Sequence, residues 1–371
     1  MTAAIGLDGR YLDPHHPGIG RYVYELARAL PTALDGIELK LLLGPGPSDR
    51  FDLDALLRAG VRLVSGGGPA RSPLAPWRLR HQVRSLGVDL WHAPYFATAF
   101  GPACPRVVTV YDAIGVLDPT FLPSLGHRLL YRLSMRAALA GAEHVITLSA
   151  TAAQDLVSRF GLARERLAII PAGVAESFRP ATAEAVAALR HKLALPPRYA
   201  LFLGTDRPHK NLAGLRAVWS RLRAAGETAG VTLVLAGFPR PRATRAPQAA
   251  GVIYAGPVAE ADLATLLSAA ELFIMPSLAE GFGLPLLEAM ACGVPVACSS
   301  AGSLPEVAAD AALFFDPRDS ASMAEAITGL LRDAGLRSRL RAAGRARAAA
   351  MTWARTAQAT AAVYRTLLAG A

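Results

Sequence analysis

The sequence predicts an α/β protein of two domains, each built on a parallel sheet with helices on its faces. Three observations predict this class. Short runs rich in Val, Leu and Ile recur along the chain, helical patterns lie between them, and the series begins again after the stretch at 176–185. A chain of 371 residues is longer than a single hydrophobic core usually accommodates. Of its residues, 52% are hydrophobic, which is enough to build two cores. We expect the two domains to face each other across a cleft.

The first half of the chain contains a series of candidate strands. They are continuous apolar runs without two-residue hairpin turns, which is typical of strands buried in a parallel sheet. The runs lie at 4–9, 38–44, 61–66, 88–94, 106–113, 143–150 and 167–174. Helical patterns separate several of them; Ile19, Val23 and Leu26, for example, follow the three- and four-residue steps of one helix face.

The second half repeats this scheme. Its apolar runs lie at 199–204, 231–237, 251–256, 271–277, 295–300 and 311–317. Pro180 interrupts the pattern just before this second series begins, so we place the domain boundary there. The predicted domains are residues 1–180 and 181–350.

The charge of the chain excludes some partners and leaves others open. The 39 basic and 29 acidic residues give a net charge of +10, and it is spread along the chain rather than gathered in a tail. Six arginines lie at 332–347, but no aromatic residues lie among them, so a solvated helix face is favoured over a nucleic-acid surface. A positive protein suits an anionic small molecule or an acidic membrane surface.

The cysteines and the N-terminus indicate a reducing compartment. Cys104, Cys292 and Cys298 are an odd number without a CxxC pair, which predicts neither a disulfide framework nor a zinc site. The first residues lack a basic segment followed by an apolar core, and no apolar run reaches about 18 residues. We therefore expect a cytoplasmic protein without a membrane span.

The stretch EGFGLPLLEAMACGVPVA at 280–297 carries the clearest chemical signal. It follows the predicted strand 271–277, so Glu280 lies in a loop at the carboxyl end of a strand, while Glu288 lies in the first turns of the next helix. The glycines let the backbone approach a ligand, and the first helical amides form an anion site. Carboxylates beside an anion site suit a ligand with phosphates and hydroxyls, such as a nucleotide sugar. The alternative is that Glu280 caps the turn and Glu288 interacts only with the helix dipole.

Several ordered motifs resemble one known family. The blocks at 275–296 and 299–317, GIGRYVYELARAL at 18–30 and RPHKNL at 207–212 resemble the family 4 retaining glycosyltransferases. The resemblance implies the GT-B fold, in which two Rossmann-like domains face across a cleft. It implies that Glu280 contacts the donor sugar and Glu288 the ribose, with the backbone of Gly281, Phe282, Gly283 and Leu284 close to the sugar and the diphosphate. It also implies that residues 351–371 form a helix that crosses back to the N-terminal domain, with Trp353 and Tyr364 as anchors.

The segment RPHKN supplies the expected diphosphate contact. Lys210 follows the predicted strand 199–204 in a chain that otherwise nearly always uses arginine, and a compact ammonium suits a diphosphate. The alternative is an exposed helix lysine. Relatives often carry an arginine where this chain has Thr205, so Arg207 is the candidate substitute.

The loop after the first strand is a second candidate for phosphate contact. PGIGRYV places Gly18 and Gly20 at a helix start but lacks the third glycine of a dinucleotide-binding loop. By resemblance we assign Gly20, and less directly Arg21, to the donor phosphate or the acceptor side. The alternative is a helix start that needs glycine only to turn.

Other candidates follow two more strands. His92, Tyr111 and Asp112 lie at predicted strand ends and are candidates for acceptor or sugar contacts, although His92 could equally be a structural histidine. Tyr111 stands where many relatives have histidine, so it can replace a hydrogen bond but not a positive charge. Asp52 and Asp54 imitate a metal-binding DxD, but helix capping explains them better.

The predicted reaction uses no metal and no cofactor beyond the nucleotide-sugar co-substrate. Lys210, Arg207 and helix-end amides would stabilise the departing diphosphate. By resemblance the transfer retains the anomeric configuration through attack on the same face, and the leaving phosphate helps to take the acceptor proton.

The helical segment 127–141 is basic and has apolar residues at helical spacing. Leu129, Leu130, Leu133 and Ala137 could form an apolar face that docks on an anionic membrane. A core-facing helix with an arginine-rich exposed side is the favoured alternative.

The sequence thus predicts transfer of a hexose, by family analogy mannose from GDP-mannose, to a glycan, lipid-linked saccharide or other glycoconjugate. One alternative is a UDP-hexose-dependent transferase with a small-molecule acceptor. Another is a non-catalytic protein that binds nucleotide sugars.

Overall fold

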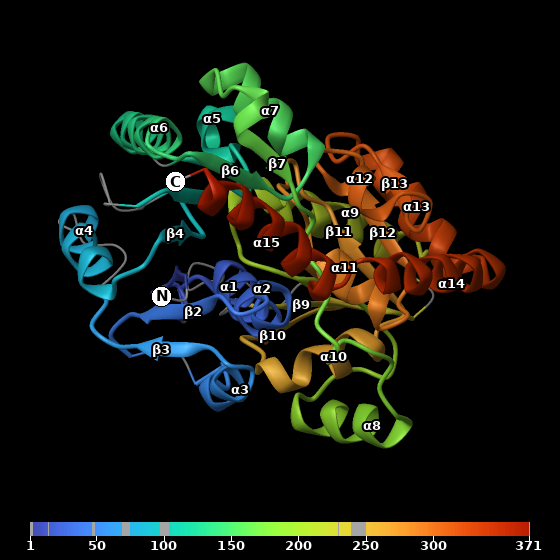
Figure 1. The fold of residues 1–371 in the computed structure, drawn as a ribbon. Coiled ribbons are helices and arrows are strands. Elements are labelled where there is room, and N and C mark those ends of the chain that lie inside the picture. Colours follow the sequence, from blue (N-terminus) through green and yellow to red (C-terminus); the bar gives the residue numbers. More distant parts are fainter. Residues whose placement is uncertain are drawn as a thin grey trace. The chain divides into compact units, whose positions relative to one another are not determined.

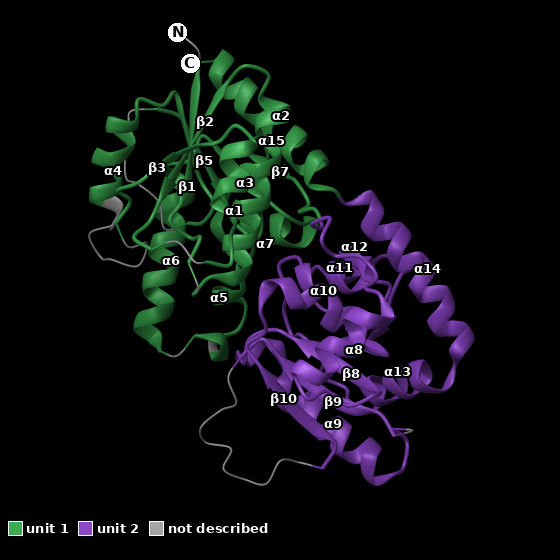
Figure 2. Cartoon of the chain, turned by 90° about the horizontal axis from the view of Figure 1, so that it is seen from below, with its two compact units in different colours: residues 1–173, 352–371 green, residues 174–351 purple. Residues whose placement is uncertain are grey.

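The computed structural model divides into two compact units. It describes residues 3–13, 15–46, 49–68, 75–96, 104–122, 124–228, 230–238 and 250–370. Unit 1 comprises Met1–Gly173 together with Thr352–Ala371, and unit 2 comprises Val174–Met351 (Figure 2). We predicted the first boundary after residue 180, and the units divide after Gly173.

Unit 1 is built on a parallel sheet of seven strands in the described part of the chain. The strands are β1 (Ala4–Gly9), β2 (Glu38–Leu43), β3 (Arg62–Val64), β4 (Leu90–Ala93), β5 (Arg106–Thr109), β6 (His144–Thr147) and β7 (Leu167–Ile169). Their order is β3-β2-β1-β4-β5-β6-β7, so the direction in which the sheet grows reverses between β1 and β4.

Unit 1 also contains helices (Figure 1). They are α1 (Pro17–Ala29), α2 (Pro31–Leu34), α3 (Leu53–Arg58), α4 (Ala75–Leu86), α5 (Ile114–Leu117), α6 (Leu125–Ala140), α7 (Ala150–Phe160) and the final helix α15 (Trp353–Ala369), with the 3₁₀ turns η1 (Pro119–Phe121) and η2 (Arg164–Arg166). On α1 the residues Tyr22, Val23 and Leu26 are buried, because their spacing places them on one face.

Unit 2 has the same plan. Its described strands are β8 (Tyr199–Leu203), β9 (Thr232–Ala236), β10 (Val252–Gly256), β11 (Leu272–Met275), β12 (Val296–Ser299) and β13 (Leu313–Phe315), in the order β10-β9-β8-β11-β12-β13. Its helices are α8 (Ala183–Lys192), α9 (Leu212–Ala224), α10 (Glu260–Ser268), α11 (Leu284–Ala291), α12 (Leu304–Ala308), α13 (Ser320–Arg332) and α14 (Ala334–Ala350), with the 3₁₀ turn η3 (Pro208–Lys210). The observed strands pair in parallel, and the reversal of growth lies between β8 and β11.

The last helix belongs to unit 1 although it follows unit 2 in the chain. Helix α15 packs against α1, α2 and β4, and its residues Trp353 and Tyr364 are buried. The connection is tight at Gly173, where an added Cβ would lie 2.2 Å from the backbone nitrogen of Trp353. Only glycine fits this approach without a shift of the backbone.

Two sequence interpretations concern helix surfaces. The Asp52 side chain accepts a hydrogen bond of 3.0 Å from the Ala55 N–H at the start of α3, which confirms the capping interpretation. The arginine-rich helix α14 exposes Arg339, Arg341 and Arg345, as expected for a solvated face.

Helix α6 differs from the favoured sequence interpretation. We favoured a core-facing apolar side, but the leucines face solvent: Leu125, Leu129, Leu130 and Leu133 are 77%, 60%, 65% and 53% exposed. The buried side is formed instead by Met135, Ala138 and Leu139, in the second half of the helix. Nothing in the described residues is both long and apolar enough to be a membrane-spanning helix.

Candidate functional site

In unit 2 the sheet topology brings two predicted loops together. Strands β8 and β11 are neighbours, and the strand order reverses between them. Ligands of open α/β sheets bind beyond the carboxyl ends of the strands at such a reversal. The segment with Lys210 follows β8, and the segment with Glu280 follows β11.

Lys210 and Glu280 form a close ion pair across these two loops. The Lys210 Nζ lies 2.6 Å from Oε2 of Glu280, although the residues are 70 positions apart in the sequence. Their side chains are only 15% and 14% exposed. The two residues that we assigned independently to diphosphate and sugar are therefore direct neighbours in the fold.

Backbone contacts fix the loops on each side of this pair. The Leu278 N–H donates to the His209 carbonyl at 2.7 Å, which ties the β11 loop to the β8 loop. Asn211 has φ 53° and ψ 36°, in the left-handed region that asparagine tolerates. Its side-chain amide donates to the Pro317 carbonyl at 2.9 Å. The turn that presents Lys210 is thus held at both ends.

His209 adds a neutral ring beside the cation. Burial and the neighbouring Lys210 charge lower the pKa of His209 to about 4. The imidazole is therefore uncharged at neutral pH, and the positive charge near it comes from Lys210 and Arg207. Arg207 is exposed at the start of η3, and Thr205 is half-buried just after β8.

The glycine-rich turn leads directly into α11. Gly283 caps this helix at φ 94°, and an added Cβ there would lie 2.7 Å from Leu304. Gly281 and Phe282 are buried before it, and Leu284 begins the helix. Glu288 is only 1% exposed, within α11. The Glu288 carboxylate is thus enclosed within unit 2, and its assignment to the ribose stays a prediction.

In unit 1, Tyr111 carries an unusual hydroxyl. Its oxygen is buried and has no hydrogen-bond partner among the residues that the structure describes. The ring packs edge-to-face against Tyr22 with centroids 5.2 Å apart. Burial raises the pKa of Tyr111 well above its ordinary value, so the group remains a neutral donor.

His92 is instead a structural histidine of β4. One ring nitrogen lies 2.5 Å from the Tyr364 hydroxyl and the other 2.8 Å from the Thr109 hydroxyl. The residue is fully buried, and burial lowers its pKa to about 3. Both nitrogens are used inside the unit, so the structure favours the alternative to a sugar contact.

The remaining unit 1 candidates lie in α1 and just before α5. Gly20 lies within α1, where an added Cβ would sit 2.8 Å from the Tyr11 carbonyl, so close packing explains this glycine. Arg21 is half-buried on the same helix. The Asp112 carboxylate accepts a hydrogen bond of 3.0 Å from the Ile114 N–H, which stabilises the start of α5.

A buried ion pair at the end of β1 was not predicted. Arg10 donates to both carboxylate oxygens of Asp8, with distances of 2.8 and 2.7 Å, and both side chains are at most 2% exposed. This pair lies at the strand-order reversal of unit 1. The polar sequence Asp-Gly-Arg at the end of an apolar run could have indicated this pair in the sequence.

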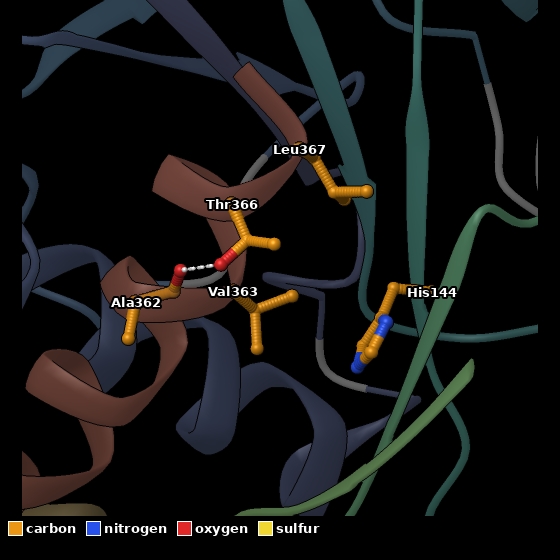
Figure 3. A pocket seen from close by; sticks show the side chains of 5 residues that line it. All are labelled: His144, Ala362, Val363, Thr366 and Leu367. Carbon is orange, nitrogen blue, oxygen red and sulfur yellow. Dashed lines mark hydrogen bonds between the residues drawn. The ribbon is translucent and has the colours of Figure 1, made fainter. Parts of the chain in front are cut away.

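A separate hollow lies at the opposite end of the unit 1 sheet. His144, Ala362, Val363, Thr366 and Leu367 line about 220 Å³ where β6 begins beside α15 (Figure 3). Its lining is mostly apolar, and it contains none of the predicted site residues.

Comparison with known families identifies the chain. A model described as Glycosyl transferases group 1 matches residues 187–347, and one described as Glycosyltransferase Family 4 matches residues 17–178. The O-antigen chain mannosyltransferase B of Escherichia coli is 31% identical over 91% of this chain and 92% of that protein. The chain belongs to glycosyltransferase family 4.

Other relatives extend the similarity. The D-inositol 3-phosphate glycosyltransferase of Mycobacterium tuberculosis (strain F11) is 31% identical over 93% of this chain and 78% of that protein. A sucrose-phosphate synthase from Thermosynechococcus elongatus has a TM-score of 0.76 at 22% identity over all of both chains. The Anabaena protein HepE in complex with UDP and glucose has a TM-score of 0.75 at 18% identity over 99% of this chain and 100% of that one. These structures establish the GT-B fold of this glycosyltransferase.

Proposed function

We propose that this glycosyltransferase moves a hexose from a nucleotide sugar to a glycan, a lipid-linked saccharide or another glycoconjugate. The observation that carries the proposal is the Lys210–Glu280 pair at the strand-order reversal of unit 2. A cation and a carboxylate in contact match the diphosphate and the adjoining sugar hydroxyls of such a donor.

Different residues of unit 2 bind different parts of the donor. Lys210, with Arg207, binds the diphosphate and stabilises the charge that develops as it leaves. Glu280 accepts hydrogen bonds from hydroxyls of the transferred sugar. Glu288 accepts them from the ribose, and the backbone at 281–284 approaches the sugar and diphosphate. In unit 1, Tyr111 is the candidate donor of a hydrogen bond to a sugar substrate.

The transfer we propose retains the anomeric configuration and uses no metal. The bond between the anomeric carbon and the diphosphate oxygen breaks, and a bond to the acceptor oxygen forms on the same face. The acceptor proton passes to the leaving diphosphate oxygen. Protein cations and amides would supply the charge stabilisation that a metal gives elsewhere.

GDP-mannose is the donor we propose first. The support is the 31% identity with a protein named as a mannosyltransferase over 91% of this chain. UDP-hexose is the alternative donor, with a small-molecule acceptor; HepE, a structural neighbour, was solved with UDP and glucose.

A binding panel followed by substitution tests the proposal. Thermal unfolding is measured with GDP, GDP-mannose, UDP and UDP-glucose, because a ligand that binds the folded state raises the unfolding temperature. Turnover of the selected donor is then compared in the wild type, Lys210→Met and Glu280→Gln, with EDTA present and absent. We expect both variants to lose about a hundred-fold or more in turnover, and EDTA to change nothing.

Lys192→Met is the matched control. Lys192 also pairs with a carboxylate at 2.7 Å, from Asp262, but its side chain is 60% exposed on the surface of unit 2. Its loss should leave turnover unchanged. Normal turnover in folded Lys210→Met and Glu280→Gln would refute the site, and binding without any turnover would favour a non-catalytic protein.

Peripheral contact with the inner face of the membrane is part of the proposal. It is supported by the exposed leucines of α6 and by Arg128, Arg132 and Arg136 on the same helix, which contains no acidic residue. Exposed apolar side chains beside arginines suit the boundary of an anionic bilayer. A cytoplasmic enzyme would reach lipid-linked acceptors in this way.

A further inference from the structure

The backbone of Glu280 is held by a serine from a different loop. The carbonyl oxygen of Glu280 accepts two hydrogen bonds from Ser303, one from its N–H at 3.1 Å and one from its hydroxyl at 3.0 Å. Ser303 is fully buried. Glu280 lies between β11 and α11, outside regular structure, so the ladder bonds of a strand or helix do not fix it.

The Ser303 hydroxyl does not cap the helix that follows it. Ser303 is the N-cap residue of α12, where a serine hydroxyl ordinarily accepts a bond from the helix backbone. Its side chain makes no capping bond here and donates to Glu280 instead. The helix thus lacks a common stabilising contact, while the Glu280 backbone gains one.

Gly302 is required by the same contact. It has φ +64°, and an added Cβ would lie 2.6 Å from the Glu280 carbonyl oxygen and 2.8 Å from its nitrogen. The loop is itself anchored, since the Ser300 N–H donates to the Phe315 carbonyl at 2.8 Å and the Ala301 N–H to the Ser299 hydroxyl at 2.9 Å. Residues 300–303 therefore form a fixed support against which Glu280 rests.

We propose that Ser303 is a positioning residue that sets Glu280 for the donor sugar, with Gly302 allowing the contact. This inference rests on the proposed role of Glu280. A carboxylate that reads sugar hydroxyls needs a defined position, which supporting hydrogen bonds provide. Ser303 acts on the sugar through Glu280 and does not touch the ligand itself.

The test separates binding of the sugar from binding of its carrier. Affinities for GDP-mannose and GDP are measured by calorimetry, or for UDP-glucose and UDP if the panel selects those. Ser303→Ala should weaken nucleotide-sugar binding about three- to ten-fold and leave diphosphate binding unchanged. Gly302→Ala should produce a larger loss in the same direction. Adding Ser303→Ala to Glu280→Gln should cause no further loss, because the serine acts through that carboxylate.

Ser149→Ala is the control for loss of a buried serine hydroxyl. Ser149 is buried in unit 1, where its hydroxyl caps α7, so its loss should lower the unfolding temperature without changing either affinity. The inference is overturned if Ser303→Ala weakens the binding of the nucleotide sugar and of the nucleoside diphosphate equally. It is also overturned if Ser303→Ala weakens nucleotide-sugar binding by the same factor in the Glu280→Gln variant as in the wild type. If Glu280→Gln alone leaves nucleotide-sugar binding unchanged, the proposed sugar contact fails and this inference fails with it.

Discussion

At the residue scale, Tyr111 shows how a side chain can be costly for folding and useful for binding. Its buried hydroxyl lacks a partner in the described part of the protein, and leaving such a group unpaired opposes folding. We expect Tyr111→Phe to keep or raise the unfolding temperature and to lower turnover about three- to ten-fold, because a sugar hydrogen bond is lost. Thermal unfolding and steady-state kinetics measure the two effects.

Tyr199→Phe is the contrasting control. The Tyr199 hydroxyl is buried in unit 2 and donates to the Leu266 carbonyl at 2.6 Å. Removing it should cost about 1 kcal/mol of unfolding free energy and leave turnover unchanged. Unchanged turnover in Tyr111→Phe would count against the proposed sugar contact.

His92 gives a prediction about pH. Burial lowers its folded-state pKa to about 3, below the ordinary value of 6.5, so between these values the unfolded chain binds more protons than the folded one. This contribution to stability is complete above pH 6.5 and is lost as the pH falls toward 3. Its slope is at most about 1.4 kcal/mol per pH unit.

The pH dependence can be isolated by substitution. Denaturant unfolding of His92→Gln between pH 4 and 7 should show a shallower fall in stability than the wild type, because the titrating ring is absent. His191→Gln, on the exposed side of α8, controls for loss of a histidine. Equal slopes in the wild type and His92→Gln would contradict the buried neutral ring.

At the element scale, α6 predicts reversible membrane binding. Replacing Leu129, Leu130 and Leu133 by serine removes three exposed apolar side chains while leaving the buried Met135, Ala138 and Leu139 in place. The affinity for phosphatidylglycerol vesicles, measured by sedimentation, should fall more than about ten-fold, since each leucine would bury apolar area in the membrane. Wild-type binding should weaken with salt because arginine attraction is screened.

The control for α6 is another exposed leucine. Leu57 on α3 is 52% exposed, and Leu57→Ser should leave vesicle binding intact. If the wild type does not sediment with these vesicles, or the triple variant sediments equally well, α6 is not the membrane contact. Self-association that disappears in the triple variant would identify a second copy of the chain as the occupant of this face.

The elements also show what sequence reasoning can reach. All thirteen strands of the described residues lie within predicted apolar runs, because parallel sheets that helices cover on both faces are built mainly from apolar residues. The periodicity of α6 indicated an apolar face but not whether that face meets a core. That depends on neighbouring elements distant in the sequence. For the same reason the chain order places Lys210 and Glu280 at strand ends, while their contact follows only from the pairing of β8 with β11.

The contacts that support the candidate site were not predicted from the sequence. Ser303 looks like an ordinary helix cap in the sequence, and only the structure shows its hydroxyl on Glu280. His92 could equally be a sugar contact or a structural histidine from the sequence, and the contacts of both ring nitrogens inside the unit favour the structural role. Side-chain satisfaction is a tertiary property that residue type and spacing do not determine.

At the scale of the whole molecule, the chain enters unit 2 at Val174 and leaves it at Met351. Unit 2 is thus one continuous segment, while unit 1 needs the C-terminal segment to complete its core. Helix α15 covers α1 and β4, and its Tyr364 hydroxyl lies 2.5 Å from the buried His92 ring. Removing it would expose apolar surface and leave a buried polar group unpaired.

Deletion of residues 352–371 should therefore unfold unit 1 selectively. Hydrogen exchange measured by peptide mass spectrometry should show lost protection in strands β1 to β7 and retained protection in β8 to β13, because each unit has its own sheet and core. Tyr364→Phe is the graded control, since it keeps the ring and removes only the hydroxyl, so unit 1 should be weakened but folded. Equal loss of protection in both units would mean that they unfold as one cooperative body, and full retention in unit 1 would show that α15 adds little to its core.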